Sequence, residues 1–186
     1  MTQAAVVLAA GQSRRFDGSV PKLLAPFRGR PLVGWAVDAA VGARLDETVV
    51  VTGATDLSAL LPPRVTILSN QSWREGQASS VRTALDWCQR QGHQAVVLGL
   101  ADQPLIPSSA WRSVAAADER PIAVATYDGR RRNPVRLDRS VWDLLDVSGD
   151  EGARSLMRRR PDLVTEVACD GEPADIDTVE ELERWS

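Results

Sequence analysis

A small-residue, basic segment follows the first apolar run of the chain and has the composition of an anion-binding loop. It covers residues 8–15, with the sequence LAAGQSRR, and the chain then continues to Lys22. Gly11 lets a ligand approach the backbone closely, successive N–H groups can form an anion-binding concavity, and Arg15 and Lys22 add positive charge. We therefore expect a polyphosphate at this loop, with a solvated surface turn as the alternative.

The two common phosphate-binding loops do not fit this segment. A dinucleotide fingerprint, GxGxxG, needs glycine where the chain has Ser13, and a Walker A loop needs serine or threonine where the chain has Leu23. No acidic ribose-binding residue follows at the usual distance. A nicotinamide-dependent dehydrogenase is therefore disfavoured.

Lys22 is the only lysine of the chain. Of the 22 Lys and Arg residues, one is Lys22 and the remaining 21 are arginine. A compact ammonium differs from a planar guanidinium, so a chain that uses arginine elsewhere retains lysine where a point charge must fit a tight place. Chance retention of a single lysine is the alternative.

Two carboxylates are placed where they could hold a divalent metal ion. Asp102 directly follows the apolar run 95–100, and Asp177 precedes a helix start in which Thr178 and Glu181 have the spacing of a capping box. Mg²⁺ prefers one or two carboxylates together with substrate phosphate oxygens. A turn residue is the alternative role of Asp102, and a favourable interaction with the helix dipole is the alternative role of Asp177.

The elements that position these residues follow from hydrophobic periodicity. Short apolar runs predict strands, and patterns of helical spacing lie between them. The predicted strands cover residues 4–8, 48–52, 65–68, 95–100, 122–126 and 163–168, and the predicted helices cover residues 32–43, 79–91, 108–117 and 140–145. This alternation predicts a three-layer α/β/α sandwich around a mostly parallel, Rossmann-like sheet. Such sheets bind ligands at the carboxyl ends of their strands, where the basic loop and Asp102 fall.

Composition limits the function classes further. The net charge of −3 and the pI of about 5.3 argue against a nucleic-acid-binding protein. The single histidine, His93, lies in a turn without a visible partner, which nearly excludes chemistry built on several histidines. Two cysteines are too few for a disulfide framework, and no segment is long and apolar enough for a membrane span. We expect residues 1–186 to form one cytoplasmic domain.

Three motifs resemble the nucleotidyltransferases that act on molybdenum cofactor, the MobA-like NTP transferase family. They are LAAGQSRRFDGSVPKLL at residues 8–24, LADQPLI at residues 100–106 and DIDTVEEL at residues 175–182. Looser matches cover residues 70–82, the Asn-Pro-Val segment 133–135 and the GDEGAR segment 149–154. The resemblance implies the fold of the nucleotide-diphospho-sugar transferases and one nucleotidyltransferase domain over residues 1–186.

The resemblance also assigns roles to individual positions. It implies that Lys22, Arg15 and Asp102 are catalytic and that Mg²⁺ binds Asp102 and Asp177, with Asp175 a weaker candidate. The acceptor molecule is expected at Asn133 and Arg136. The expected nucleotide-binding residues are Leu8, Ala9, Ala10, Gly11, Arg15, Lys22, Asn70, Gly76 and Ser80.

The implied reaction is transfer of CMP from CTP to the phosphate of molybdopterin, with release of pyrophosphate. Ala10 favours CTP, because the cytidylyl-transferring branch reads LAAG where the guanylyl-transferring branch reads LAGG. A phosphate monoester is already ionised near neutrality, so the reaction needs no general base. The alternatives are guanylyl transfer from GTP to this or another phosphorylated small molecule, and a nucleotide-binding regulator without turnover. The implied partners are a recipient molybdoenzyme or its chaperone, with no nucleic acid and no membrane.

Overall fold

A seven-stranded sheet forms the centre of the molecule in the computed structural model, which describes residues 1–13, 15–145 and 153–186. Its strand order is β5-β4-β1-β6-β8-β7-β9. Among these strands only β8 runs antiparallel to its neighbours, β6 and β7. The strands are β1 (Gln3–Ala9), β4 (Glu47–Thr52), β5 (Thr66–Ser69), β6 (Ala95–Leu100), β7 (Ile122–Tyr127), β8 (Arg130–Asp138) and β9 (Val164–Ala168). The predicted mostly parallel sheet is therefore confirmed.

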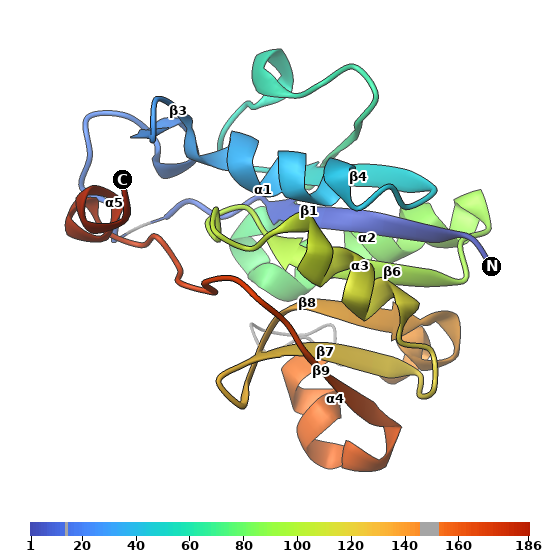
Figure 1. Cartoon of the computed structure of the whole chain (residues 1–186). Helices are drawn as coiled ribbons and strands as arrows, with labels where there is room; N and C mark the ends of the chain where they lie inside the picture. Colours follow the sequence, from blue (N-terminus) through green and yellow to red (C-terminus); the bar gives the residue numbers. More distant parts are fainter. Residues whose placement is uncertain (14, 146–152) are drawn as a thin grey trace.

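Helices cover both faces of the sheet, as the continuously apolar strands require. The helices α1 (Leu32–Gly42) and α3 (Ser108–Ala116) lie in front of the sheet in Figure 1, and α2 (Gln77–Gln91) lies behind it. Helix α4 (Ala153–Arg159) packs against the same core as α2, and α5 (Val179–Trp185) lies beyond the carboxyl ends of the strands. The helix predicted over residues 140–145 is instead a 3₁₀ helix, Arg139–Leu144.

Each central strand packs against two hydrophobic cores, one on each face of the sheet, because successive side chains of a strand point to opposite faces. In β1, Ala5 and Val7 pack with α1, whereas Val6 and Leu8 pack with α2. Gly99 in β6 makes room for Trp111 of α3, since a Cβ there would lie 2.4 Å from the indole ring. The central strands of the sheet therefore contribute to both cores at once.

A crossing segment, residues 169–178, connects the outermost strand β9 to α5 over the carboxyl ends of the sheet (Figure 1). Backbone hydrogen bonds fasten it along the way, from Cys169 N to Thr126 O at 3.0 Å and from Ile176 N to Asp102 O at 3.0 Å. Ile176 is fully buried. The segment therefore delivers Asp177 to the end of β6. No helix among the described residues is long and apolar enough to cross a membrane.

A partly buried polar cluster stabilises the opposite, amino-terminal edge of the sheet. Glu47 accepts hydrogen bonds from Thr66 Oγ1 at 2.6 Å and Trp87 Nε1 at 3.1 Å, and His93 Nε2 lies 2.8 Å from Glu47 Oε2. His93 thus has a partner, contrary to what the sequence indicated. Burial opposes ionisation of Glu47, but these hydrogen bonds outweigh it and hold the pKa of Glu47 below its ordinary value of 4.5.

We expect Glu47→Gln to lower the free energy of unfolding by about 1–3 kcal/mol at pH 7, because the partly buried donors of Thr66 and Trp87 lose a charged acceptor. A lowered folded-state pKa gives stability that is present above the unfolded pKa and lost as pH falls through the folded pKa. The difference between variant and wild type should therefore shrink below pH 4.5. Urea unfolding at pH 7 and pH 4 measures it, with the exposed Glu119→Gln as control. An equal difference at both pH values would contradict the assignment.

Candidate active site

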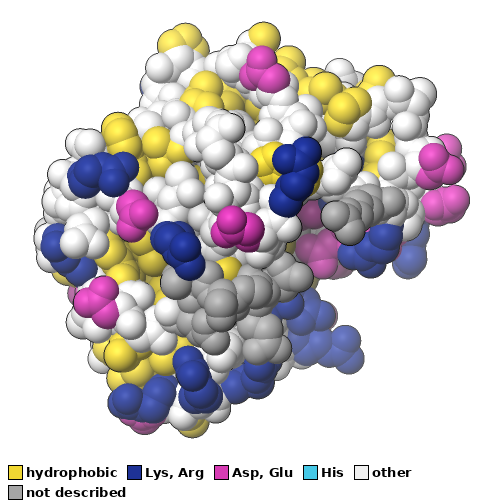
Figure 2. Space-filling model, turned by 180° about the vertical axis from the view of Figure 1, so that it is seen from behind, with side chains coloured by type: hydrophobic (Ala, Val, Ile, Leu, Met, Phe, Trp, Pro, Cys, Tyr) yellow, Lys and Arg dark blue, Asp and Glu magenta, His cyan; other side chains and the backbone are white. Residues whose placement is uncertain are grey.

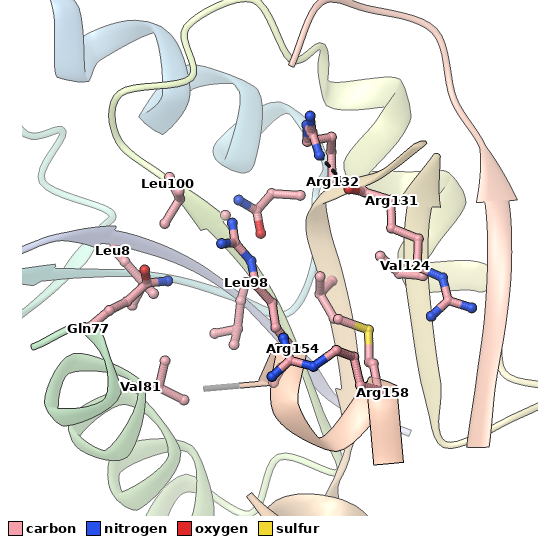
Figure 3. A pocket seen from close by; sticks show the side chains of 15 residues that line it. Leu8, Gln77, Val81, Leu98, Leu100, Val124, Arg131, Arg132, Arg154 and Arg158 are labelled. Atoms are coloured by element: carbon pink, nitrogen blue, oxygen red, sulfur yellow. Dashed lines mark hydrogen bonds between the residues drawn. The ribbon is translucent and has the colours of Figure 1, made fainter. Parts of the chain in front are cut away.

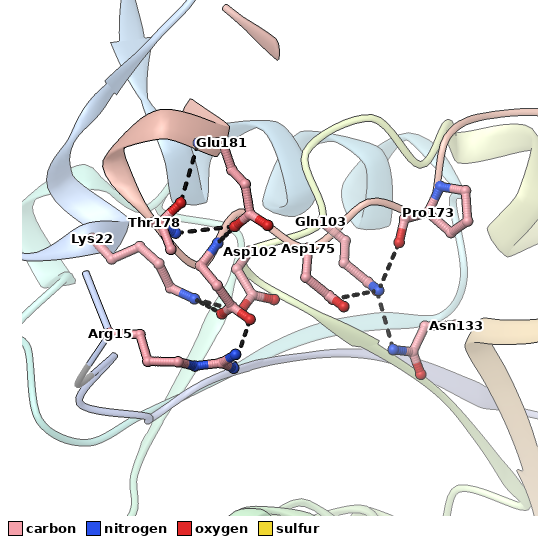
Figure 4. A network of polar contacts seen from close by, with 10 residues as sticks. Arg15, Lys22, Asp102, Gln103, Asn133, Pro173, Asp175, Thr178 and Glu181 are labelled. Carbon is pink, nitrogen blue, oxygen red and sulfur yellow. Dashed lines mark hydrogen bonds and ion pairs between the residues drawn. The ribbon is translucent and has the colours of Figure 1, made fainter. Parts of the chain in front are cut away.

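A buried ammonium between two carboxylates lies at the carboxyl edge of the sheet. Lys22 Nζ donates to Asp102 Oδ2 at 2.6 Å and to Asp177 Oδ1 at 3.0 Å (Figure 4). The Lys22 side chain is only 5 % exposed. Lys22 begins a short 3₁₀ helix, Asp102 follows β6 and Asp177 ends the crossing segment, so three distant parts of the sequence meet here.

Asp177 is held in place by the helix that follows it. Glu181 Oε2 accepts hydrogen bonds from Asp177 N at 2.7 Å and Thr178 N at 3.0 Å, and Glu181 N donates to Thr178 Oγ1 at 3.2 Å. This is the predicted capping box of α5. The second carboxylate oxygen of Asp177 accepts from Arg15 Nη2 at 2.7 Å, and Arg15 is otherwise 77 % exposed. A carboxylate held by the start of α5 thus meets an exposed cation that a ligand can reach.

The charges of this cluster determine its protonation. Burial lowers the pKa of Lys22, but the charges and hydrogen bonds of Asp102 and Asp177 outweigh burial and raise the pKa above its ordinary 10.5. Lys22 is therefore an ammonium at neutral pH. Partial desolvation, and then the charge of Asp102, raises the pKa of Asp175, which accepts its hydrogen bond from Gln103 rather than from Lys22.

The donor atoms fit a divalent cation that also binds phosphate. Asp102 Oδ1 is buried and has no hydrogen-bond partner in the described structure. The described residues contain no group of three or more His, Cys, Asp and Glu side chains that could hold a metal ion without a ligand. Mg²⁺ is commonly held by one or two carboxylates plus phosphate oxygens, so Asp102 and Asp177 suffice if a triphosphate supplies the rest.

A cavity of about 290 Å³ adjoins the cluster and contains most of the positions expected to bind nucleotide. A Cβ added to Gly11 would meet no atom within 4 Å, so this glycine leaves open space rather than filling a packed core. The lining residues are Leu8, Ala10, Gly11, Trp73, Gly76, Gln77, Ser80, Leu100 and Asp102.

Two expected nucleotide-binding residues lie behind the cavity wall. Ala9 packs into the core under α1. Asn70 is buried, and its Nδ2 donates to Ser79 Oγ at 2.8 Å and Ser80 Oγ at 2.9 Å. Asn70 therefore fixes the start of α2, and neither residue lines the cavity.

Gly53, Trp73 and Gln77 contribute to the cavity but were not among the sequence candidates. Trp73 and Gln77 line it directly. A Cβ at Gly53 would lie 2.7 Å from Ala10 O and 2.8 Å from Trp73 Cβ, so only glycine permits this wall. Its position directly after the predicted strand 48–52 was the available signal, since ligands bind at such strand ends.

A second cavity, of about 380 Å³, shares Leu8, Gln77 and Leu100 with the first (Figure 3). Apolar side chains form much of its lining, and Arg131, Arg132, Arg154 and Arg158 line the side formed by β8 and α4. Viewed from the α2 side, basic side chains gather over the half of the molecule that carries β8 and α4 (Figure 2). The remaining lining residues are Val81, Leu98, Gly99, Val124, Asn133, Val135, Ala153 and Met157.

The expected acceptor residues divide between the two faces of β8. Asn133 lines the second cavity, but Arg136 is 1 % exposed and pairs with Val97 and Ala123, which belong to the α1 side of the sheet. Because side chains alternate along a strand, Arg136 points away from the cavity that Val135 lines. Arg136 therefore does not line this cavity. Residues 149–152 of the GDEGAR segment lie outside the described residues.

A mostly parallel sheet with a basic loop after β1 and acidic residues at the carboxyl ends of its strands has the features of a nucleotide-dependent transferase. The chain belongs to the family described as MobA-like NTP transferase domain, which matches residues 5–164. The family and fold expected from the sequence are thus confirmed.

Relatives and a solved structure match nearly the whole chain. Nicotine blue oxidoreductase of Paenarthrobacter nicotinovorans is 32% identical, over 96% of this chain and 94% of the relative. Purine catabolism protein PucB of Bacillus subtilis is 30% identical, over 96% and 93%. The crystal structure of Rv0371c from Mycobacterium tuberculosis is 28% identical, with a TM-score of 0.83 over 98% of this chain and 96% of that chain, and it has also been solved in complex with manganese.

Proposed function

We propose that this chain is a single-domain cytidylyltransferase that transfers CMP from CTP to the phosphate of molybdopterin and releases pyrophosphate. The observation that carries the proposal is the cluster of Lys22, Asp102 and Asp177 beside two adjoining cavities. One cavity suits the nucleotide and the other suits a flat heteroaromatic ring system with an anionic group. Their shared wall would bring the α-phosphate of CTP and the acceptor phosphate together.

The residues support transfer by positioning and charge neutralisation. An oxygen of the acceptor phosphate forms a bond to the α-phosphorus of CTP, the bond from that phosphorus to the bridging oxygen breaks, and pyrophosphate leaves. Lys22 and Arg15 neutralise the charge that develops on the leaving pyrophosphate. The attacking phosphate is already ionised, which agrees with the absence of histidine from the described lining residues of both cavities.

Asp102 and Asp177 would hold Mg²⁺ in this proposal. When bound, a divalent ion supplies further positive charge to the phosphate oxygens and orients them. Rv0371c, which is 26% identical to this chain, has been solved in complex with manganese, and this supports the proposal of a divalent ion. The arginines that line the second cavity would bind the acceptor phosphate, and its apolar side chains would bind the ring system.

The product would be cytidylylated molybdopterin, which we propose passes to a recipient molybdoenzyme or its chaperone. GTP is the alternative nucleotide, and a nucleotide-binding regulator is the alternative class.

Pyrophosphate release tests the proposal directly. The purified protein is mixed with Mg²⁺, one nucleoside triphosphate at a time and molybdopterin, and release is compared with that from mixtures lacking the acceptor. CTP should support release that depends on the acceptor, and no nucleotide should do so without it. Nucleotide binding without release would favour the regulator. Because one relative is called an oxidoreductase, oxidation of NADH and NADPH is measured in parallel, and activity there without pyrophosphate release would overturn the proposal.

Nucleotide choice gives a prediction for Ala10, whose buried methyl group lies in the wall of the nucleotide cavity. We expect the wild type to prefer CTP and Ala10→Gly to relax this preference toward GTP, because the methyl group occupies space that a purine needs. One methyl group in a pocket changes discrimination by about 1–3 kcal/mol, so the variant should accept both nucleotides. The ratio of kcat/KM for CTP and GTP measures the effect. An unchanged ratio, or a wild type that prefers GTP, would remove Ala10 from nucleotide selection.

A further inference from the structure

Gln103 is a buried amide that joins the metal-binding side of the site to the second cavity. It follows Asp102 directly and is only 3 % exposed. Its Nε2 donates to Asp175 Oδ1 at 2.9 Å and to Pro173 O at 3.3 Å, both in the crossing segment. Its Oε1 accepts from Asn133 Nδ2 at 3.1 Å (Figure 4).

The orientation of both amides is fixed by a backbone carbonyl. Pro173 O can only accept a hydrogen bond, so Gln103 must turn its NH₂ group toward it. The oxygen of Gln103 then faces Asn133, and Asn133 must in turn offer its own NH₂ group. Amide orientations are assigned from such networks, and this one has a single consistent solution. It does not depend on the protonation of Asp175, because the carbonyl of Pro173 does not titrate.

Asn133 consequently presents its carbonyl oxygen rather than its NH₂ group to other partners. Asn133 lines the second cavity, and no described residue donates a hydrogen bond to its Oδ1. Among the described residues, the charged side chains that line this cavity are all arginines, one of which, Arg131, also pairs with Glu166 at 2.7 Å. The cavity therefore offers positive charge along one side and one oriented hydrogen-bond acceptor at Asn133.

We infer that Gln103 is a positioning residue that sets the hydrogen-bond polarity of Asn133, so that the acceptor molecule places an N–H or O–H donor against Asn133 and its anionic group among the arginines. This inference rests on the proposed function only in taking the second cavity as the acceptor site. It adds a requirement on the ring system of the acceptor. An anionic group at Asn133 would meet a carbonyl oxygen and would be repelled.

Equilibrium binding of small pterins tests the inference without turnover. The probes are 6-carboxypterin and two analogues in which methyl groups block the 2-amino or the 3-N–H donor. In wild type, blocking one of these donors should weaken binding about tenfold, the effect expected for the loss of one hydrogen bond between neutral groups. The same analogue should bind Asn133→Ala as well as 6-carboxypterin does. If neither blocked analogue distinguishes wild type from Asn133→Ala, the inference that Asn133 accepts a hydrogen bond from the ligand is wrong.

A double-mutant cycle tests the part of Gln103. Gln103→Met keeps the side-chain length but removes its hydrogen bonds. It should weaken the binding of 6-carboxypterin about tenfold, while the affinity for CTP in the presence of Mn²⁺ should change less than twofold. The double variant with Asn133→Ala should bind no more weakly than Asn133→Ala alone. Equal losses of pterin and CTP affinity together with a lower Tm would show that Gln103 has a merely structural role. If the double variant loses pterin affinity by the product of the two single losses, Gln103 does not act through Asn133.

The outcomes separate this inference from the proposed function. Pyrophosphate release with molybdopterin, combined with an unchanged pterin affinity of Gln103→Met, would overturn only the inference. If the pterins bind and the double-mutant cycle of Gln103 and Asn133 gives the expected result, but no nucleotidyl transfer occurs, only the proposed function is overturned. A wild type that binds none of the pterins would overturn the inference and the choice of molybdopterin as acceptor.

Discussion

Lys22→Ala is expected to lower the turnover of nucleotidyl transfer by about 10²- to 10³-fold or more, the usual effect of removing one preorganised group that stabilises developing charge. The ammonium is buried at the site and is the only lysine of the chain, so no neighbouring lysine can replace it. Lys22→Arg should also be impaired, because the planar guanidinium does not fit a position that is only 5 % exposed. Pyrophosphate release at saturating CTP and molybdopterin measures both effects.

Metal binding should change in the opposite direction in the same variant. In this structure Lys22 Nζ lies on one oxygen of Asp102 and one oxygen of Asp177, the two proposed metal ligands. Removal of the ammonium removes a competitor for these oxygens, so Lys22→Ala should bind Mn²⁺ more tightly than wild type when no nucleotide is present. Titration followed by electron paramagnetic resonance measures this affinity. Turnover near that of wild type, or weaker Mn²⁺ binding, would contradict the assigned role of Lys22.

Asp102→Asn is expected to lower activity by about 10²-fold and to raise the Mg²⁺ concentration needed for half-maximal activity, because an amide oxygen carries no net charge to hold the ion. The buried, unpartnered Oδ1 of Asp102 is the atom most directly available to a cation. Folding should suffer less, since Asp177 still accepts a hydrogen bond from Lys22. Activity as a function of Mg²⁺ concentration, together with Tm, separates the two effects.

Two comparisons make the Asp102 result specific. Asp170→Asn removes the same charge from an exposed position of the crossing segment and should leave the Mg²⁺ requirement unchanged. Asp177→Asn should raise the requirement more than Asp175→Asn, because Asp177 contacts Lys22 whereas Asp175 contacts Gln103. An unchanged metal requirement in Asp102→Asn would show that Asp102 is only a turn residue.

Local patterns in the sequence were enough to predict six of the seven strands of the central sheet, most helices and the mostly parallel strand arrangement, but not the antiparallel strand β8. Strands buried on both faces must be apolar along their whole length, and this property is visible without the fold. The capping box of Thr178 and Glu181 is equally local, because its partners are three residues apart. Lys22, Asp102 and Asp177 could be selected as candidates because residue type and position after a strand mark such sites.

The tertiary structure alone decided which of these candidates meet and which way each side chain points. Lys22 lies 80 residues from Asp102 and 155 residues from Asp177 in sequence, and only the crossing segment brings the three together. Whether Asn133 or Arg136 reaches the cavity depends on strand register, since a shift of one residue exchanges the two faces. The orientation of Gln103 depends on a carbonyl 70 residues away. The sequence specifies residue chemistry and local periodicity, whereas contacts across such separations exist only once the chain has folded.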